Sequence, residues 1–421
     1  MTLLEKLFDR DFLDKAWYLL NRDNIDSYGF SRQTISDFEA NLEQNLTKIS
    51  QELKSGSYKF SKLRAAVIPK PNGKYRPLQI SEIRDRVVLK AMAVIVEEEF
   101  AELLAKNKLV SFAYQKGRGV KEAVLQMKAL FHKNKASYVL KGDIVNFFEE
   151  INKEVLIIEK LLPNLKDNSI DSLLNSALDQ KLGGVKWLKK ELWDLFKNAG
   201  KGIPQGNPLS PLLSNIYLSE FDEFCQNNGF HLVRYADDMV LVCQSEKEAN
   251  ETFELINEFL VKKYALKIHP IGINGDKTQI IAPAVGNELN FLGVDFDGVN
   301  LRPDQKCLGG LLGSIKSIIK LNDNHQSAKD EITILLNRWI SVFSYADIDI
   351  YFDKIDRFIV KYFLKKYNKH YPKSAQCKRM AFLVRNRQKA KDKNSIWNNL
   401  EFKFLLPVVK WIKKWKAPKV A

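Results

Sequence analysis

Apolar side chains recur at three- and four-residue steps near both ends of this 421-residue chain, which is the spacing of one buried helix face. Leu42, Leu46, Ile49 and Leu53 form the first series, and Ile355, Ile359, Phe363 and Tyr367 form the second. We therefore predict helices within residues 1–60 and mainly helical structure from about residue 311 onward. Further helices are predicted over residues 83–106, 150–198, 210–227 and 246–264.

Short, mostly apolar runs bounded by turn residues predict strands in the middle of the chain. Residues 63–69 and 75–78 are expected to form a hairpin around the turn-forming Pro71-Asn72-Gly73. A second hairpin is expected from residues 230–235 and 239–244, with Ala236-Asp237-Asp238 at its turn. The remaining predicted strands are residues 138–144, which include Asp143 near their end, and residues 265–269, 278–282 and 291–296.

The charge is distributed unevenly along the chain. Lys and Arg total 66 and Asp and Glu total 51, which gives a net charge of +15. From Lys354 onward there are 20 basic and 3 acidic residues, so this tail carries +17 and the rest of the chain carries −2. Hydrophobic residues make up 45% of the chain, enough for a large core, which excludes a disordered basic protein. A basic tail on a folded body predicts a polyanionic partner, with nucleic acid first and an anionic membrane surface second.

Composition disfavours several other classes of protein. The four cysteines are scattered without a C-x-x-C pair, so neither a disulfide framework nor a cysteine zinc site is expected. The five histidines include no H-E-x-x-H, which argues against a metallohydrolase. The first residues lack the apolar segment of a signal peptide, and no window of 18 apolar residues occurs. A cytoplasmic protein without a membrane partner is therefore expected.

Two adjacent carboxylates, Asp237 and Asp238, stand at the turn of the second predicted hairpin. Like charges so close together repel and raise a pKa, and a divalent cation removes that repulsion. Asp143, at the end of another strand, could complete a site for two Mg²⁺ ions that clamp an in-line phosphoryl displacement. Taken alone, an Asp-Asp pair is more often a solvated turn. The surrounding sequence must decide between these interpretations.

Six blocks of sequence resemble the reverse transcriptases of the bacterial, group II intron-like branch. Tyr235-Ala236-Asp237-Asp238 resembles the family's Y-x-D-D box. Residues 202–218 (GIPQGNPLSPLLSNIYL) resemble its P-Q-G-x-x-x-S-P-x-L-x-N-x-x-L block. The other four are residues 68–78, similar to the fingers hairpin, 143–148, similar to D-I-x-x-F-F, 274–278, similar to N-x-x-K-T, and 291–293, similar to the F-L-G turn. The blocks follow the family's order over about residues 60–300.

The resemblance implies roles for individual residues. Asp143, Asp237 and Asp238 would be catalytic and, with Ile144, would hold two Mg²⁺ ions. Five residues would bind the incoming deoxynucleotide: Lys70, Arg76, Phe148, Gln205 and Lys277. Phe148 matches the bulky side chain that occludes a ribose 2′ hydroxyl, and Lys277 would act as a general acid or a phosphate contact. The alternatives are surface charge for Lys70, Arg76 and Lys277, and a core aromatic for Phe148.

Other residues are expected to contact primer and template. The resemblance assigns this role to Tyr235 and to the turn Phe291-Leu292-Gly293. In the tail, basic residues interleave with aromatic ones, as at Lys410, Trp411, Lys413 and Lys414. Basic groups neutralise phosphates and aromatic rings stack on bases, so we expect the tail to grip a template–primer duplex or a structured RNA. The alternative is an amphipathic helix whose Trp residues pack against the protein, or, less favoured, one that lies on a membrane.

The implied fold is α+β, a right-hand polymerase with an antiparallel palm sheet and a helical thumb. The expected segments are residues 1–60 (N-terminal helical extension), 61–136 (fingers), 137–160 (first part of the palm), 161–201 (fingers insertion), 202–300 (second part of the palm) and 301–421 (helical, basic thumb and C-terminal RNA-binding region).

The implied function is an RNA-directed DNA polymerase that uses an RNA template, a DNA or RNA primer and dNTPs. The block Q-G-N-P-L-S-P differs from the S-Q ending of diversity-generating retroelement enzymes, and no retron-type N-A-x-x-H or intron-type Cys/His endonuclease extension is found. A free-standing bacterial enzyme is therefore expected, in antiphage defence with a dedicated noncoding RNA. The alternatives are a maturase-like RNA-binding protein and an untemplated or protein-primed DNA polymerase.

Overall fold

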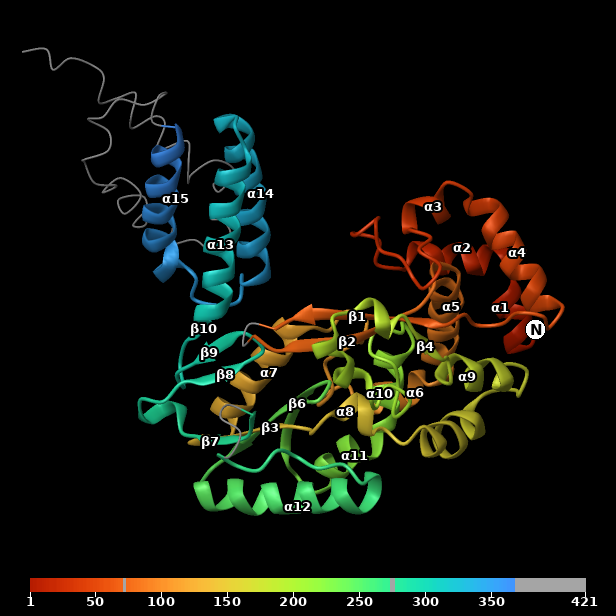
Figure 1. The fold of residues 1–421 in the computed structure, drawn as a ribbon. Coiled ribbons are helices and arrows are strands. Elements are labelled where there is room, and N and C mark those ends of the chain that lie inside the picture. Colours follow the sequence, from red (N-terminus) through yellow and green to blue (C-terminus); the bar gives the residue numbers. More distant parts are fainter. Residues whose placement is uncertain (71–72, 273–276, 368–421) are drawn as a thin grey trace, which may run out of the picture. The chain divides into compact units, whose positions relative to one another are not determined.

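The computed structural model describes residues 1–70, 73–272 and 277–367. The chain divides into two compact units, Met1–Ile281 and Ala282–Ala421, and each is described by itself (Figure 1). No described helix is both long enough and apolar enough to cross a membrane. The division into fingers, palm and thumb segments remains a prediction.

Helices form the N-terminal part of the first unit, as predicted. They are α1 (Leu3–Phe8), α2 (Arg10–Tyr18), α3 (Ile35–Glu39) and α4 (Leu42–Lys54), and they pack with α5 (Ile83–Glu99). Thr2 and Thr34 form capping boxes that satisfy the free N–H groups at the starts of α1 and α3. Leu46, Ile49 and Leu53 are buried, which confirms the apolar face expected on α4.

The predicted basic hairpin is present, and it belongs to a three-stranded sheet. Strand β1 (Leu63–Pro69) pairs antiparallel with β2 (Tyr75–Ile80) and parallel with β4 (Leu182–Gly183). We did not predict β4, because a two-residue strand that includes a glycine carries no alternating pattern. The 150–198 region is otherwise helical, with α9 (Asp171–Leu178), a π-helical segment η1 (Val155–Leu161) and the 3₁₀ turns η2 (Leu162–Asn164), η3 (Val185–Trp187) and η4 (Lys190–Phe196).

The first unit also contains a four-stranded antiparallel sheet, which lies on the side of the unit away from α1–α4 (Figure 1). Its strands follow the order β5 (His231–Tyr235), β6 (Asp238–Cys243), β3 (Tyr138–Asp143) and β7 (Gln279–Ile281). Five consecutive residues of β6, 239–243, are buried, so both faces of the sheet are covered. Helices α7 (Val120–Lys133), α11 (Ser219–Asn227) and α12 (Glu246–Tyr264) pack against it.

Three sequence predictions were wrong in detail. The helix predicted over residues 83–106 breaks at Phe100 into α5 and α6 (Ala101–Lys106), and that over 210–227 breaks at Leu218 into α10 (Ser210–Tyr217) and α11. Both break residues are buried apolar residues, so neither break carries the usual Gly or Pro signal. Residues 265–269 contribute only an isolated bridge, between Ile144 and Ile268. The short helix α8 (Phe147–Glu150) follows β3.

Up to residue 367, where the described part ends, the second unit contains a small antiparallel sheet and three long helices. The sheet has the order β10 (Leu301–Pro303), β9 (Val294–Phe296) and β8 (Leu289–Phe291), so the segment 291–296 spans two strands where we predicted a single arm. The helices are α13 (Gln305–Leu321), α14 (His325–Val342) and α15 (Phe352–Tyr367), and short 3₁₀ turns occur at η6 (Pro283–Val285) and η7 (Asp349–Tyr351). Ile355, Ile359, Phe363 and Tyr367 are all buried, which confirms the apolar face predicted for this helix.

Candidate active site

Two of the three predicted catalytic carboxylates lie opposite each other on neighbouring strands. Asp143 is the last residue of β3 and Asp238 is the first residue of β6, and the two pair in register. Tyr235 pairs with Asp238 across the β5–β6 turn, which leaves Ala236 and Asp237 at the tip. Ala236 has a left-handed backbone with φ of 59°. The three aspartates therefore meet at one end of the β5–β6–β3–β7 sheet, where the second predicted hairpin has its turn and the predicted strand 138–144 ends.

The carboxylates of the turn are held in an environment that opposes negative charge. Burial raises the pKa of Asp237, and the nearby Asp143 raises it further. Burial also raises the pKa of Asp238, to about 6, with contributions from Asp237 and Asp143. Such a site gains stability from protons or from a bound cation.

Two basic side chains of the same chain lie against Asp143. The Nζ atom of Lys277 donates a hydrogen bond to Oδ2 of Asp143 at 2.6 Å. His269 Nε2 lies 3.4 Å from Oδ1, and the His269 backbone N–H donates to the Asp143 carbonyl at 3.0 Å. We predicted Lys277 as a nucleotide contact but did not identify His269. Residues 265–269 form only the isolated bridge between Ile144 and Ile268, so no strand pattern aligns His269 with Asp143.

The donor set fits a divalent cation that is shared with a substrate. Within the described ranges, no three His, Cys, Asp or Glu side chains are grouped closely enough to hold a metal ion by themselves. Mg²⁺ sites on phosphate substrates commonly use only one or two carboxylates, together with phosphate oxygens and water. Asp143 and Asp238, paired in register and crowded by like charge, offer such a partial ligand set. Ile144, the other expected ligand, follows Asp143 directly.

The predicted nucleotide-binding residues of the basic hairpin approach this end of the sheet. Arg76 on β2 is exposed, and its charge partly offsets the rise in the pKa of Asp237 that burial and Asp143 cause. Lys70, just beyond β1, is also exposed, and it partly offsets the rise in the pKa of Glu149, the neighbour of Phe148, that burial and Glu150 cause. Both basic side chains therefore lie within electrostatic reach of the β3–β6 region. Their contact with a triphosphate remains a prediction.

Phe148 and Gln205 are brought together by the loop that contains Gly202. The Ile203 backbone N–H donates to the Phe148 carbonyl at 2.8 Å, and the Gln79 N–H on β2 donates to the Gln205 carbonyl at 2.8 Å. Gly202 has φ of 59°, and a Cβ there would collide with the Phe148 carbonyl oxygen. Phe148 itself is half-buried, whereas its neighbour Phe147 is buried in the core. A ring at the edge of the core could either exclude a ribose 2′ hydroxyl or simply pack against the core.

The remaining predicted contacts lie elsewhere. Phe291, Leu292 and Gly293 belong to the second unit, where Leu292 (φ 52°) and Gly293 (φ 81°) form the β8–β9 turn and Phe291 is buried. Residues 274–276 of the N-x-x-K-T block, and Lys410, Trp411, Lys413 and Lys414 of the tail, lie outside the described residues.

A family model for the reverse transcriptase (RNA-dependent DNA polymerase) matches residues 68–296, more than half of the chain. The chain is a reverse transcriptase. Its matched region contains the three aspartates, the basic hairpin and the Gly202 loop. Reverse transcriptase domains use divalent metal ions and RNA templates, so the family agrees with the chemistry of the carboxylate site.

This reverse transcriptase is similar to a group II intron-encoded protein and to a retron reverse transcriptase, among other relatives. Protein YkfC of Escherichia coli is 29% identical over 61% of this chain and 72% of its own length. The group II intron-encoded protein LtrA of Lactococcus lactis is 31% identical over 49% of this chain, and the match spans only 33% of LtrA. The retron Ec83 reverse transcriptase of Escherichia coli is 27% identical over 41% of this chain and 53% of its own length.

Among solved structures, a Candida albicans telomerase matches 90% of this reverse transcriptase and 71% of its own chain, with 12% identity and a TM-score of 0.46.

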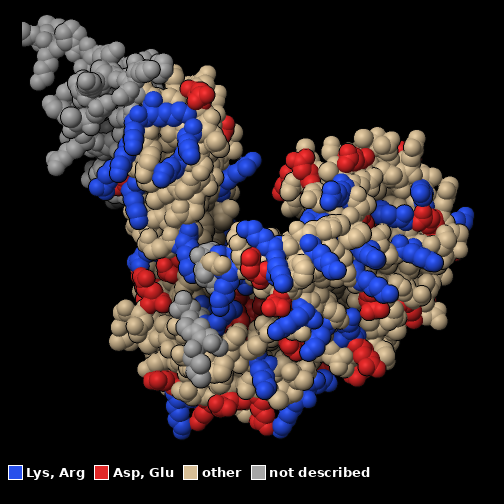
Figure 2. All heavy atoms as spheres, in the orientation of Figure 1, with Lys and Arg blue, Asp and Glu red and all other residues tan. Residues whose placement is uncertain are grey.

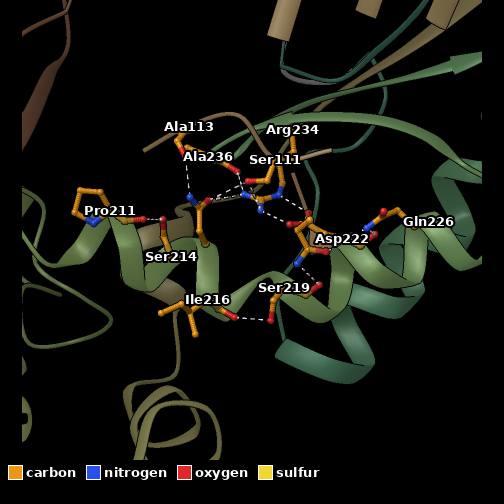
Figure 3. A network of polar contacts seen from close by, with 12 residues as sticks. Ser111, Ala113, Pro211, Ser214, Ile216, Ser219, Asp222, Gln226, Arg234 and Ala236 are labelled. Carbon is orange, nitrogen blue, oxygen red and sulfur yellow. Dashed lines mark hydrogen bonds and ion pairs between the residues drawn. The ribbon is translucent and has the colours of Figure 1, made fainter. Parts of the chain in front are cut away.

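Sequence reasoning missed a buried polar network of this reverse transcriptase that reaches the turn at Ala236 (Figure 3). At its centre is Arg234, which is fully buried and forms an ion pair with Asp222. The one sequence signal is an arginine inside the otherwise apolar strand β5.

Tyr114 was also missed. The residue is partly exposed, at 46%, and its backbone has φ of 59°. Partial burial raises the pKa of Tyr114, and the nearby carboxylate of Asp237 raises it further.

Proposed function

We propose that this chain extends a primer with deoxynucleotides on an RNA template, and that the three aspartates carry the reaction. The observation behind the proposal is the register pairing of Asp143 with Asp238 beside Asp237, inside the matched reverse transcriptase region. A solvated turn would place its carboxylates in water. Here burial raises the pKa of both turn aspartates, and such a turn suits cation binding.

Asp143, Asp237 and Asp238, together with Ile144, would hold two Mg²⁺ ions. When bound, these ions supply the charge that an in-line nucleotidyl transfer requires. The protein's own part is to keep the three carboxylates close together despite their repulsion. We propose that Lys277 leaves Asp143 and contacts a triphosphate oxygen when a nucleotide binds, since its side chain is half exposed and is free to change partners.

We propose that Lys70, Arg76, Phe148 and Gln205 bind the incoming nucleotide. Lys70 and Arg76 present charge on the hairpin arms, and the Gly202 loop joins Gln205 to the backbone of Phe148. A half-buried ring whose backbone is held by this loop is rigid enough to exclude a 2′ hydroxyl by contact. Tyr235, Phe291, Leu292 and Gly293 would contact primer and template.

We propose that the basic tail binds RNA and that the partner is a dedicated noncoding RNA used in antiphage defence. The support is the +17 charge from Lys354 onward and its interleaved aromatic residues. Figure 2 shows Lys and Arg side chains gathered over the helices of the second unit. These helices carry the exposed residues Lys316, Lys320, Lys361 and Lys365.

Charge reversal at Lys413 and Lys414 should weaken RNA binding and reduce its salt dependence. An unchanged salt slope would argue for a packing role.

A primer-extension assay with purified protein, Mg²⁺, dNTPs and a defined RNA template tests the polymerase proposal. Asp238→Asn should lower extension by at least about a hundredfold, since it removes a carboxylate that would hold the Mg²⁺ ions at the reacting phosphate. Asp179→Asn is the matched control, because this exposed aspartate makes only a surface ion pair with Lys153. If Asp238→Asn retains full activity in the cell, a maturase-like RNA-binding role replaces polymerisation.

A further inference from the structure

Arg234 lies one residue before the Tyr235-Ala236-Asp237-Asp238 turn, and its guanidinium is fully buried. Its Nε and Nη2 donate to the two carboxylate oxygens of Asp222, at 2.7 and 2.5 Å. Nη2 also donates to Ser111 Oγ at 3.0 Å, and Nη1 donates to Asn215 Oδ1 at 3.2 Å. The fifth bond runs from Nη1 to the backbone carbonyl of Ala236 at 3.0 Å (Figure 3). All five N–H donors of the guanidinium are therefore used.

The bond to Ala236 reaches the residue of the turn that most needs support. Ala236 has φ of 59°, a left-handed conformation that the Cβ of an L-residue disfavours. The nearby carboxylates also repel one another: in addition to burial, Asp143 raises the pKa of Asp237, and Asp237 raises the pKa of Asp238. Both effects favour an opened turn. A buried, fixed donor on the Ala236 carbonyl opposes that opening.

The guanidinium is in turn fixed by three separate elements. Asp222 lies on α11, Asn215 lies on α10, and Ser111 lies in the segment after α6. The same segment is tied to Arg234 through its backbone, because the Arg234 N–H donates to the Val110 carbonyl at 2.7 Å and the Phe112 N–H donates to the Arg234 carbonyl at 2.9 Å. Arg234 thus connects the turn to a rigid frame.

We propose that Arg234 is a positioning residue that holds the catalytic turn in its metal-binding shape before any metal arrives. This inference rests on the proposed function, because it treats Asp237 and Asp238 as the ligands being positioned. Net stability alone is a weak reason to bury such an ion pair, since apolar replacements of similar volume are often neutral or stabilising. A preformed ligand geometry is the gain that an apolar core could not supply, because only a fixed donor can hold the Ala236 carbonyl.

The test compares variants by their Mg²⁺ midpoint, which is the Kd obtained from the rise in melting temperature over a Mg²⁺ titration, since bound Mg²⁺ stabilises the folded state by RT ln(1 + [Mg²⁺]/Kd). Arg234→Lys keeps the charge but cannot make five bonds in a planar fork. We expect it to raise that midpoint by about tenfold or more, in the range seen when outer-shell partners of metal ligands are removed. The Mg²⁺ concentration for half-maximal primer extension should rise in parallel.

A second variant distinguishes loss of the hydrogen bond to Ala236 from misfolding of the protein. The double substitution Arg234→Met with Asp222→Leu replaces the buried pair by apolar side chains and removes the donor to Ala236. It should fold and show the same loss of Mg²⁺ response. The matched control is Asp85→Asn, which weakens another buried polar site, where the carboxylate of Asp85 accepts from Tyr58 at 2.7 Å and from the Ser61 N–H at 2.9 Å. It should lower the melting temperature without moving the Mg²⁺ midpoint.

Two outcomes separate this inference from the proposed function. If the folded Arg234 variants keep the wild-type Mg²⁺ midpoint and lose only stability, Arg234 is structural and the inference is wrong, whatever the polymerase activity. If the wild type responds to Mg²⁺ but extends no primer, the proposed function fails, and the melting experiment still decides the role of Arg234.

Discussion

Lys277 donates from Nζ to Oδ2 of Asp143 at 2.6 Å, so a cation of the chain itself neutralises the carboxylate that ends β3. Asp143 is nearly buried, whereas the Lys277 side chain is about half exposed. The lysine can therefore leave at low cost, because partly exposed ion pairs contribute only about 0–1 kcal/mol.

Lys277→Ala should have opposite effects on metal and nucleotide. Without Lys277, Mg²⁺ no longer competes with an ammonium group for Asp143, so its half-saturation in thermal melting should fall by up to about fivefold, the equivalent of about 1 kcal/mol. The KM for dNTPs should rise, because a phosphate contact is lost. Melting curves with Mg²⁺ and steady-state extension kinetics check both. An unchanged Mg²⁺ midpoint together with an unchanged KM would assign Lys277 to the surface.

The metal-free protein should lose stability as the pH rises from about 4 to 7. The pKa of Asp238 is raised to about 6 in the folded protein, against 3.8 for an ordinary aspartate. A raised acid pKa means that the folded state binds the proton more tightly, so this stability is complete below about pH 4 and is lost as the pH passes 6, on the order of 3 kcal/mol. Urea unfolding in EDTA measures it, and Mg²⁺ should reverse the trend because it binds the ionised form. Asp238→Asn should flatten the slope, and an identical slope in that variant would place the titration elsewhere.

Gly202→Ala should disrupt the loop that joins Phe148 to Gln205. The added Cβ meets the Phe148 carbonyl, and φ of 59° adds strain of about 1–2 kcal/mol. We expect a loss of more than about 2 kcal/mol in unfolding free energy and a raised KM for dNTPs. Gly229→Ala is the control, because Gly229 also has a positive φ, of 71°, but a Cβ there meets nothing within 4 Å. Equal effects of the two substitutions would show that backbone strain alone is responsible.

Phe148→Ala should relax discrimination against ribonucleotides, since the ring would no longer exclude a 2′ hydroxyl. The ratio of kcat/KM for dNTP to that for the matching rNTP should fall by at least about tenfold, which is the lower end of what one apolar contact contributes to selectivity. Phe147→Leu is the control, because Phe147 is buried and its loss should affect stability only. An unchanged ratio in Phe148→Ala would leave the ring as part of the core.

The site was predictable where local sequence determines the geometry. Strand β3 ends in Asp143 and the antiparallel β6 begins with Asp238. The two acids meet because each strand has its own apolar pattern and the Ala236 turn joins β5 to β6. The helix breaks at Phe100 and Leu218 were not predictable, because tertiary packing of apolar residues produces them. The partners of Arg234 come from positions 111, 215 and 222, and nothing local in the sequence relates an arginine in a strand to an asparagine and an aspartate on two helices.

The most direct test of the account is to sequence the product that the purified chain makes from a defined RNA template with a matched primer, Mg²⁺ and all four dNTPs. The account predicts DNA complementary to the template, and at least about a hundredfold less of it from Asp238→Asn. A product unrelated to the supplied RNA would indicate untemplated or protein-primed synthesis. Equal synthesis by wild type and Asp238→Asn would contradict the assignment of the catalytic carboxylates.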